Sequence, residues 1–204
     1  MIAIVDYGVG NLFSLRSSLQ YLGADVTVTG DADVLSKADQ VILPGVGAFE
    51  DAAAKLRSTG LDQVVIEAAK SGTPLLGICL GMQLLLERSF EYGEYRGLGL
   101  IQGDVVSMEP VVPQGYKVPH IGWNALHFPE DKPRSPIFTD LKEGDFVYFV
   151  HSYYADRCPA VTATTEYGAV LTAAVGRDNV YGCQFHPEKS GAVGLSILRA
   201  FCRL

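Results

Sequence analysis

A single cysteine in this sequence has neighbours that suit a nucleophile. Cys79 lies within G-I-C-L-G (residues 77–81), between an apolar run and a segment with helical spacing. This is the form of a nucleophile elbow with cysteine in the place of serine. A strand that turns sharply into a helix brings backbone atoms close on both sides of the nucleophile, so glycine is needed where a Cβ would clash. The pattern therefore predicts a reactive thiol at the amino end of a helix.

Such a position favours covalent catalysis by a thiolate. The aligned peptide dipoles at the start of a helix stabilise negative charge on the sulfur. The backbone N–H of Leu80 would then be free to bind an oxyanion. The alternative is that Cys79 is an inert buried thiol in a tight turn, which would need no base elsewhere in the chain.

His186 is the best candidate for that base. In C-Q-F-H-P-E-K-S (residues 183–190), Glu188 follows it by two positions, with Pro187 between them. Proline favours an extended conformation of the residue before it, and residues i and i+2 of an extended segment point the same way. Glu188 can therefore accept the imidazole N–H and leave the other ring nitrogen facing Cys79. The three residues would form a Cys-His-Glu triad, although an ordinary His-Pro-Glu loop is the alternative.

The other histidines have weaker settings. His127 lies beside Phe-Pro at an expected surface position, and His120 and His151 have no acidic residue within three positions. We therefore assign them no catalytic role.

Two further features lie near the expected site. The turn L-P-G-V-G-A-F-E-D (residues 43–51) could supply backbone N–H groups to an oxyanion hole opposite Leu80. A phosphate-binding loop is a less suitable interpretation of this turn, because a third glycine and a Gly-Lys-Ser/Thr sequence are missing. Gln83 follows Cys79 by four positions, so it shares one helix face and leans back over the elbow. It could hold an amide or carboxylate of a substrate, or it could be a solvated helix residue.

The elements that must position these residues are expected to form an α/β fold. Apolar strands alternate with helical segments in the first 80 residues, and strands covered on both faces are typical of a parallel sheet. From about residue 95 to 185 the pattern changes to strands and turns, which predicts antiparallel additions to the same sheet or a small mixed layer beside it. The expected strands of the first part are 2–7, 25–29, 40–45 and 74–78, and the expected helices are 12–23, 48–58, 61–72 and, at the end of the chain, 191–204.

The composition excludes several classes of function. The chain has 204 residues and a formal net charge of −7, without a basic run, so a nucleic-acid partner is not expected. The apolar stretches are far shorter than the roughly 20 residues of a membrane helix, and no basic segment of a signal peptide is expected at the start. No C-x-x-C pair occurs, so we expect no metal site and free thiols in the cytoplasm. The four cysteines are Cys79, Cys158, Cys183 and Cys202.

The motifs P-G-V-G-A-F, G-I-C-L-G-M-Q-L-L and Q-F-H-P-E-K-S occur in this order over nearly the whole chain. As a set they resemble the class I (triad) glutamine amidotransferases. The resemblance implies a single amidotransferase domain over residues 1–204, with a three-layer flavodoxin-like fold of a central mostly parallel sheet and added antiparallel strands. It also implies L-glutamine as the substrate and no cofactor.

The resemblance assigns a role to each matching position. Cys79 would attack the side-chain amide of glutamine, and His186 with Glu188 would complete the triad. Backbone groups at Gly47 and Leu80 would stabilise the oxyanion. The substrate-binding residues would be Gln83, Ser152 and Tyr153.

The flanking motifs narrow the resemblance. D-Y-G-V-G-N-L-F-S, H-I-G-W-N and Y-F-V-H-S-Y-Y-A are similar to those of glutaminase subunits that pass ammonia to a cyclase subunit with a (β/α)₈ barrel in histidine biosynthesis. Because ammonia is protonated and lost in bulk water, such a heterodimer should bury the exit from Cys79. Aromatic anchors with a few polar groups suit such an interface. The expected interface residues are Asn11, Trp123, Asn124, Tyr148 and Lys189, with a core position for Trp123 and a solvated Lys189 as the alternatives.

Other functions remain open at this point. A glutaminase subunit could serve another acceptor, such as anthranilate or aminodeoxychorismate, although the Lys after His-Pro-Glu and the H-I-G-W-N stretch are not typical of those relatives. A catalytically silent flavodoxin-like regulatory module would retain the fold with an unreactive Cys79. A cysteine peptidase would need no partner.

Overall fold

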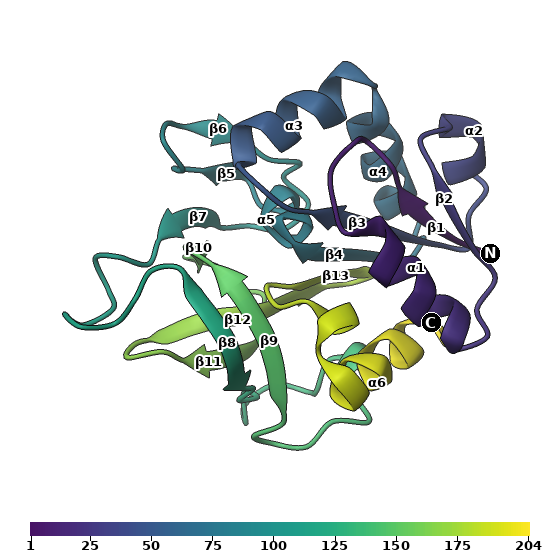
Figure 1. Cartoon of the computed structure of the whole chain (residues 1–204). Coiled ribbons are helices and arrows are strands. Elements are labelled where there is room, and N and C mark those ends of the chain that lie inside the picture. The colour runs from purple at the N-terminus through teal and green to yellow at the C-terminus, as the bar shows by residue number, and fades with distance from the viewer.

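The computed structural model describes residues 1–204 as an α/β fold around a seven-stranded sheet (Figure 1). The strand order is β11-β12-β13-β4-β3-β1-β2. The five strands from β13 to β2 are parallel, and β11 and β12 extend the sheet in antiparallel fashion. The strands are β1 (Ile2–Val5), β2 (Val26–Thr29), β3 (Gln40–Gly45), β4 (Leu75–Cys79), β11 (Val161–Glu166), β12 (Val170–Arg177) and β13 (Val180–Cys183).

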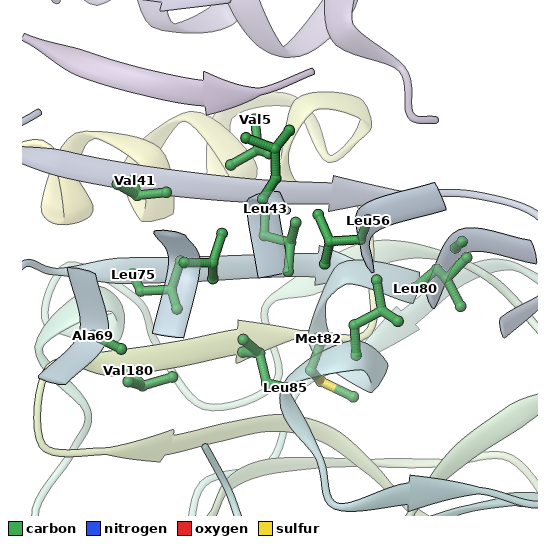
Figure 2. Close-up of a cluster of buried hydrophobic side chains, with 14 of the residues drawn as sticks. Val5, Val41, Leu43, Leu56, Ala69, Leu75, Leu80, Met82, Leu85 and Val180 are labelled. Atoms are coloured by element: carbon green, nitrogen blue, oxygen red, sulfur yellow. The ribbon is translucent and has the colours of Figure 1, made fainter. Parts of the chain in front are cut away.

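Helices cover both faces of this sheet, as the apolar strands predict. Alternate residues of each strand face opposite sides, so Ala3 and Val5 pack under α2, α3, α4 and α5, whereas Ile2 and Ile4 pack against α1 and α6. The two clusters contain 26 and 23 buried residues, so neither face is left uncovered. Figure 2 shows part of the first cluster, in which Leu43 of the sheet lies beside Leu56 of a covering helix. The helices are α1 (Leu12–Tyr21), α2 (Ala32–Leu35), α3 (Phe49–Ser58), α4 (Leu61–Lys70), α5 (Leu80–Leu85) and α6 (Gly191–Phe201).

The later strands form both of the arrangements that the sequence allows, which are additions to the central sheet and a separate layer beside it. Some extend the central sheet, while others form a four-stranded sheet and a two-stranded antiparallel sheet beside it. The apolar segment 145–155 is divided at Ser152, because β9 belongs to the two-stranded sheet and β10 to the four-stranded sheet. The additional elements are β5 (Arg88–Ser89), β6 (Tyr95–Arg96), β7 (Asp104–Ser107), β8 (His120–Ala125), β9 (Phe146–His151), β10 (Tyr153–Asp156) and the 3-10 turns η1 (Pro136–Phe138) and η2 (Pro187–Lys189).

The carboxyl ends of the parallel strands meet at one edge of the central sheet. There β4 ends at Cys79, β3 leads into the glycine-rich turn at 45–47, and β13 leads towards His186. This edge is where open α/β sheets bind ligands. No helix is long and apolar enough to cross a membrane.

Candidate active site

The backbone at Cys79 has the strained geometry of a nucleophile elbow. Its φ of 55° and ψ of −113° are unusual for a residue with a side chain, and it directly precedes α5. A Cβ on Gly81 would overlap the carbonyl oxygen of Leu43, and one on Gly77 would lie 2.8 Å from the backbone of Gly81. The flanking glycines are therefore required by the close packing of α5 against β3 and β4, as the sequence predicts.

His186 and Glu188 are paired in the buried interior. His186 Nδ1 and Glu188 Oε1 are 2.8 Å apart, and both side chains are only 3% exposed. Because a carboxylate accepts hydrogen bonds, Nδ1 carries the proton and Nε2 is left for Cys79. Burial alone would lower the pKa of His186, but hydrogen bonds and charges from Cys79 and Glu188 outweigh it and raise this pKa to about 9.

The backbone reaches this pairing by a different route from the one expected. His186 is extended, with φ −100° and ψ 99°, as the following proline predicts. Glu188, however, lies in η2 and not in a continued extended segment, so that part of the prediction is wrong. Proline is well suited to the first position of a helix, and the N–H of Lys189 closes the turn by donating to the carbonyl of His186 at 3.0 Å.

The raised pKa of His186 predicts a pH-dependent stability. The folded chain binds a proton at His186 up to about pH 9, whereas the unfolded chain releases it near 6.5, so stability must fall as pH rises between these values. We expect the free energy of unfolding in urea to be higher for the wild type than for His186→Gln, with the largest difference below pH 6.5. This difference should decrease by on the order of 1–3 kcal/mol as pH rises through about 9. A difference in unfolding free energy that stays constant or grows over this interval would contradict a protonated His186 side chain in the folded protein.

A cavity of about 340 Å³ opens above the elbow and contains most of the predicted site. Its volume is at the small end of ligand pockets, which suits a single amino acid. Besides Cys79 and His186, it is lined by both predicted oxyanion positions, Gly47 and Leu80, and by all three predicted substrate-binding residues. The full lining is Val46, Gly47, Cys79, Leu80, Gln83, Glu91, Tyr92, Pro119, Val150, His151, Ser152, Tyr153 and His186.

The two predicted oxyanion positions come from different segments. Gly47 has φ +92°, which suits glycine, and its N–H donates no hydrogen bond to another backbone group. Leu80 is the first residue of α5. A Cβ on Gly45 would lie 2.7 Å from the backbone nitrogen of Gly81, so the glycine-rich turn lies directly against the elbow.

Glu91 lines the cavity, although the sequence pattern did not predict it there. It is the only carboxylate lining the cavity. Its Oε2 accepts a hydrogen bond of 2.7 Å from the N–H of Phe49 at the start of α3, and burial raises its pKa. No motif marks this position, because the segment after β5 reaches the cavity only through tertiary packing. No cluster of three or more His, Cys, Asp or Glu side chains is arranged to hold a metal ion.

The expected interface residues are only partly brought together. Trp123 and Tyr148 are cross-strand neighbours in the two-stranded β8–β9 sheet, with ring centroids 6.1 Å apart. Trp123 is 54% exposed, which excludes the core alternative, and it lies near Gly191, two residues after the exposed Lys189. Ile121, 59% exposed, shares its side of β8.

The two asparagines differ from this group. Asn11 is at the start of α1, and α1 contacts η2, which carries Lys189. Asn124 is on the opposite side of β8 from Trp123. Its side chain donates to the carbonyl of Glu166 and accepts from the N–H of Ala125. The structure therefore does not place Asn124 with the exposed aromatic residues.

The elbow, the paired imidazole and the cavity together form a candidate active site, with a cysteine in the nucleophile position of a three-layer α/β fold. The chain belongs to the glutamine amidotransferase class-I family, whose sequence model matches residues 3–203. It is similar to imidazole glycerol phosphate synthase subunit HisH of Geobacillus thermodenitrificans, with 51% identity over 98% of this chain and 94% of the relative. The protein of the same name from Caldanaerobacter subterraneus subsp. tengcongensis is 48% identical over 98% of this chain and 97% of the relative.

A solved structure supports the fold independently of close sequence similarity. PurLQS from Thermotoga maritima superimposes with a TM-score of 0.77 over 99% of this chain and 97% of that chain. Only 19% of the residues are identical, so this likeness concerns the fold alone.

Proposed function

We propose that this chain is the glutaminase subunit of an imidazole glycerol phosphate synthase, in histidine biosynthesis. It hydrolyses L-glutamine to glutamate and ammonia, and the ammonia passes to a cyclase subunit. The observation that carries this function is the cavity in which Cys79 faces the buried His186–Glu188 pair. About half of all residues are identical to those of HisH subunits over nearly the full length, which supports this acceptor over anthranilate or aminodeoxychorismate.

The geometry supports a two-step reaction through a thioester. The Cys79 thiolate attacks the side-chain carbonyl carbon of glutamine, and the N–H groups of Gly47 and Leu80 stabilise the oxyanion. His186, protonated at the start, gives its Nε2 proton to the departing ammonia. The now neutral His186 takes a proton from water, which attacks the γ-glutamyl thioester and releases glutamate. Glu188 keeps the imidazole in the orientation that both steps need.

Glu91 is the natural partner for the α-ammonium group of glutamine, because the cavity offers no other carboxylate. We expect Glu91→Gln to raise the KM for glutamine by about 10- to 100-fold with little change in kcat, since a charged hydrogen bond to the bound substrate is lost. The variant keeps an acceptor for the N–H of Phe49. Steady-state glutamate release measures the effect, and Glu130→Gln on the exposed surface is the matched control. A change in kcat alone would place Glu91 outside the substrate-binding site.

The cyclase subunit is proposed to have a (β/α)₈ barrel fold and to dock over Trp123, Tyr148 and Lys189. The N–H of His186 donates to the carbonyl of Tyr148 at 3.0 Å, and the N–H of Tyr148 donates to Ser190 Oγ at 3.0 Å. These hydrogen bonds connect the surface of the two-stranded β8–β9 sheet directly to the triad, as the route of a protected ammonia molecule would need. Residues 1–204 would act as one domain, and the four free cysteines suit a reducing cytoplasm.

The experiment that tests this function is glutamate release by the purified chain, alone and with the cyclase subunit loaded with its phosphoribulosyl formimino nucleotide. Slow turnover alone and a large increase with the loaded partner are expected. The partner's products should be imidazole glycerol phosphate and aminoimidazole carboxamide ribotide. Glutamate release that the partner does not change would count against this acceptor, and no release under either condition would leave Cys79 as an inert thiol.

A further inference from the structure

Gln184 is a buried polar residue that the reaction described above does not use. It follows β13, is completely buried, and lies two residues before His186. Its Nε2 is 3.9 Å from Cys79 Sγ, and its Oε1 accepts a hydrogen bond of 3.0 Å from Nε2 of Gln83. One amide group therefore contacts both the nucleophile and a residue of the substrate cavity.

The backbone carbonyl of Tyr153 determines which way these amides point. It can only accept hydrogen bonds, and Gln83 lies 3.1 Å from it, so the NH₂ group of Gln83 must face that oxygen. The second N–H of Gln83 then meets Gln184, which must present its own oxygen. The NH₂ group of Gln184 consequently faces the sulfur of Cys79.

A second chain of hydrogen bonds ends at the same carbonyl. His151 Nδ1 lies 2.9 Å from the oxygen of Tyr153 and must donate to it, which leaves His151 Nε2 to accept from His120 Nδ1 at 3.1 Å. Burial lowers the pKa of His151 to about 3 and that of His120 to about 4, so both rings are neutral. Tyr153, whose neighbour Ser152 also lines the cavity, is thereby held from two sides.

This arrangement leaves one free group on Gln83. Both of its N–H bonds are used within the chain, whereas its Oε1 has no partner and is not among the sequestered polar atoms. Since Gln83 lines the cavity, it presents an acceptor, and not a donor, to the substrate.

We propose that Gln184 is a positioning residue for glutamine hydrolysis, which donates a hydrogen bond to the Cys79 thiolate and holds the Gln83 amide with its oxygen towards the substrate. The proposal rests on the proposed function, since it deepens the account of the same site. It couples the ionised state of the nucleophile to the shape of the substrate cavity through a single side chain.

Other groups also face the nucleophile and must be kept constant in any test. His186 lies near enough to Cys79 for the sulfur to help raise the imidazole pKa, and Glu188 bonds the other ring nitrogen. The Tyr7 hydroxyl donates a hydrogen bond of 2.7 Å to the carbonyl of Pro44. Burial, and to a smaller extent the charge of Cys79, raise the pKa of Tyr7, so this hydroxyl also lies near the sulfur. Burial, with a smaller contribution from the charge on His186, lowers the pKa of His151 and keeps it neutral. Substitution of Gln184 alters none of these side chains.

The test compares Gln184→Met and Gln184→Glu with the wild type. The first readout is the rate at which iodoacetamide alkylates Cys79 in the full chain as a function of pH, followed by mass spectrometry of the Cys79 peptide. We expect the midpoint pH of this rate to rise by about one unit in Gln184→Met, because a hydrogen bond to the thiolate is lost. Gln184→Glu should raise it further, because a negatively charged carboxylate disfavours a nearby thiolate.

The second readout is glutamine hydrolysis in the complex with the loaded cyclase subunit. Gln184→Met should raise the KM for glutamine by about tenfold, because the Gln83 amide is no longer held in one orientation. Gln40→Met is the matched control: Gln40 is also buried and donates one hydrogen bond, to the carbonyl of Phe201, away from the site. It should lower the melting temperature without moving the alkylation midpoint or the KM.

An alkylation midpoint that is unchanged in both Gln184 variants would overturn the proposal, whatever their stability. If Gln184→Met does not fold, the nearly isosteric Gln184→Glu still tests the proposal, because an unchanged midpoint in that variant would overturn it. A failure of the proposed function can be distinguished from a failure of this proposal. If the wild-type complex releases no glutamate, the proposed function fails, but the alkylation of Cys79 can still be measured.

Discussion

Cys79→Ser is expected to reduce glutamate release by about 10⁴-fold or more while leaving the fold in place. The serine hydroxyl fits the elbow, but it stays protonated at neutral pH, whereas a thiolate is a strong nucleophile. The substitution also removes the charge that helps to keep a proton on His186. Both the attack on the amide and the protonation of the leaving ammonia are thereby impaired.

The measurement is glutamate release by the complex with the cyclase subunit, with Cys158→Ser as the matched control. Cys158 is a free, half-buried cysteine outside the cavity lining, so its substitution should leave activity unchanged. An ammonium salt supplied in place of glutamine should restore product formation by the Cys79→Ser complex, because only the source of ammonia is lost. Glutaminase activity within about tenfold of the wild type would exclude Cys79 as the nucleophile.

Gly81→Ala is expected to prevent folding or to lower the free energy of unfolding by at least about 4 kcal/mol. The new Cβ would overlap the carbonyl oxygen of Leu43 and lie 3.2 Å from the backbone of Pro44. Leu43 is in the middle of the completely buried β3, which is paired on both sides, so neither backbone can move without disturbing the sheet. The loss would consume a large part of the 5–15 kcal/mol by which a typical domain is stable.

Urea unfolding of the purified variants measures this effect. Gly144→Ala provides the comparison, because Gly144 has φ +82° but open space around the position of a Cβ. Gly144→Ala should lower the free energy of unfolding by only roughly 1–3 kcal/mol, because alanine disfavours this backbone conformation. If Gly81→Ala were no more destabilised than Gly144→Ala, the close approach of α5 to β3 would not be required for stability.

The sequence by itself determined the features that depend on neighbouring residues. Apolar periodicity identifies β1 to β4 and α1, α3, α4 and α6, because each strand and helix must bury its own apolar side chains. The glycines around Cys79 reveal a sharp turn, since only residues without a Cβ allow it. The spacing of His186 and Glu188 predicts their pairing, which two residues of separation permit in either an extended segment or a 3-10 turn.

Only the tertiary structure decided how distant segments complete the site. Gln83 bonds residues 70 and 101 positions away, at Tyr153 and Gln184, and no local pattern carries that information. Glu91 reaches the cavity because the segment after β5 packs against the start of α3. Asn124 is turned away from Trp123 because side chains alternate along β8. Such contacts depend on the order and pairing of strands, which many residues determine together, and so they cannot be inferred from any short stretch of the chain.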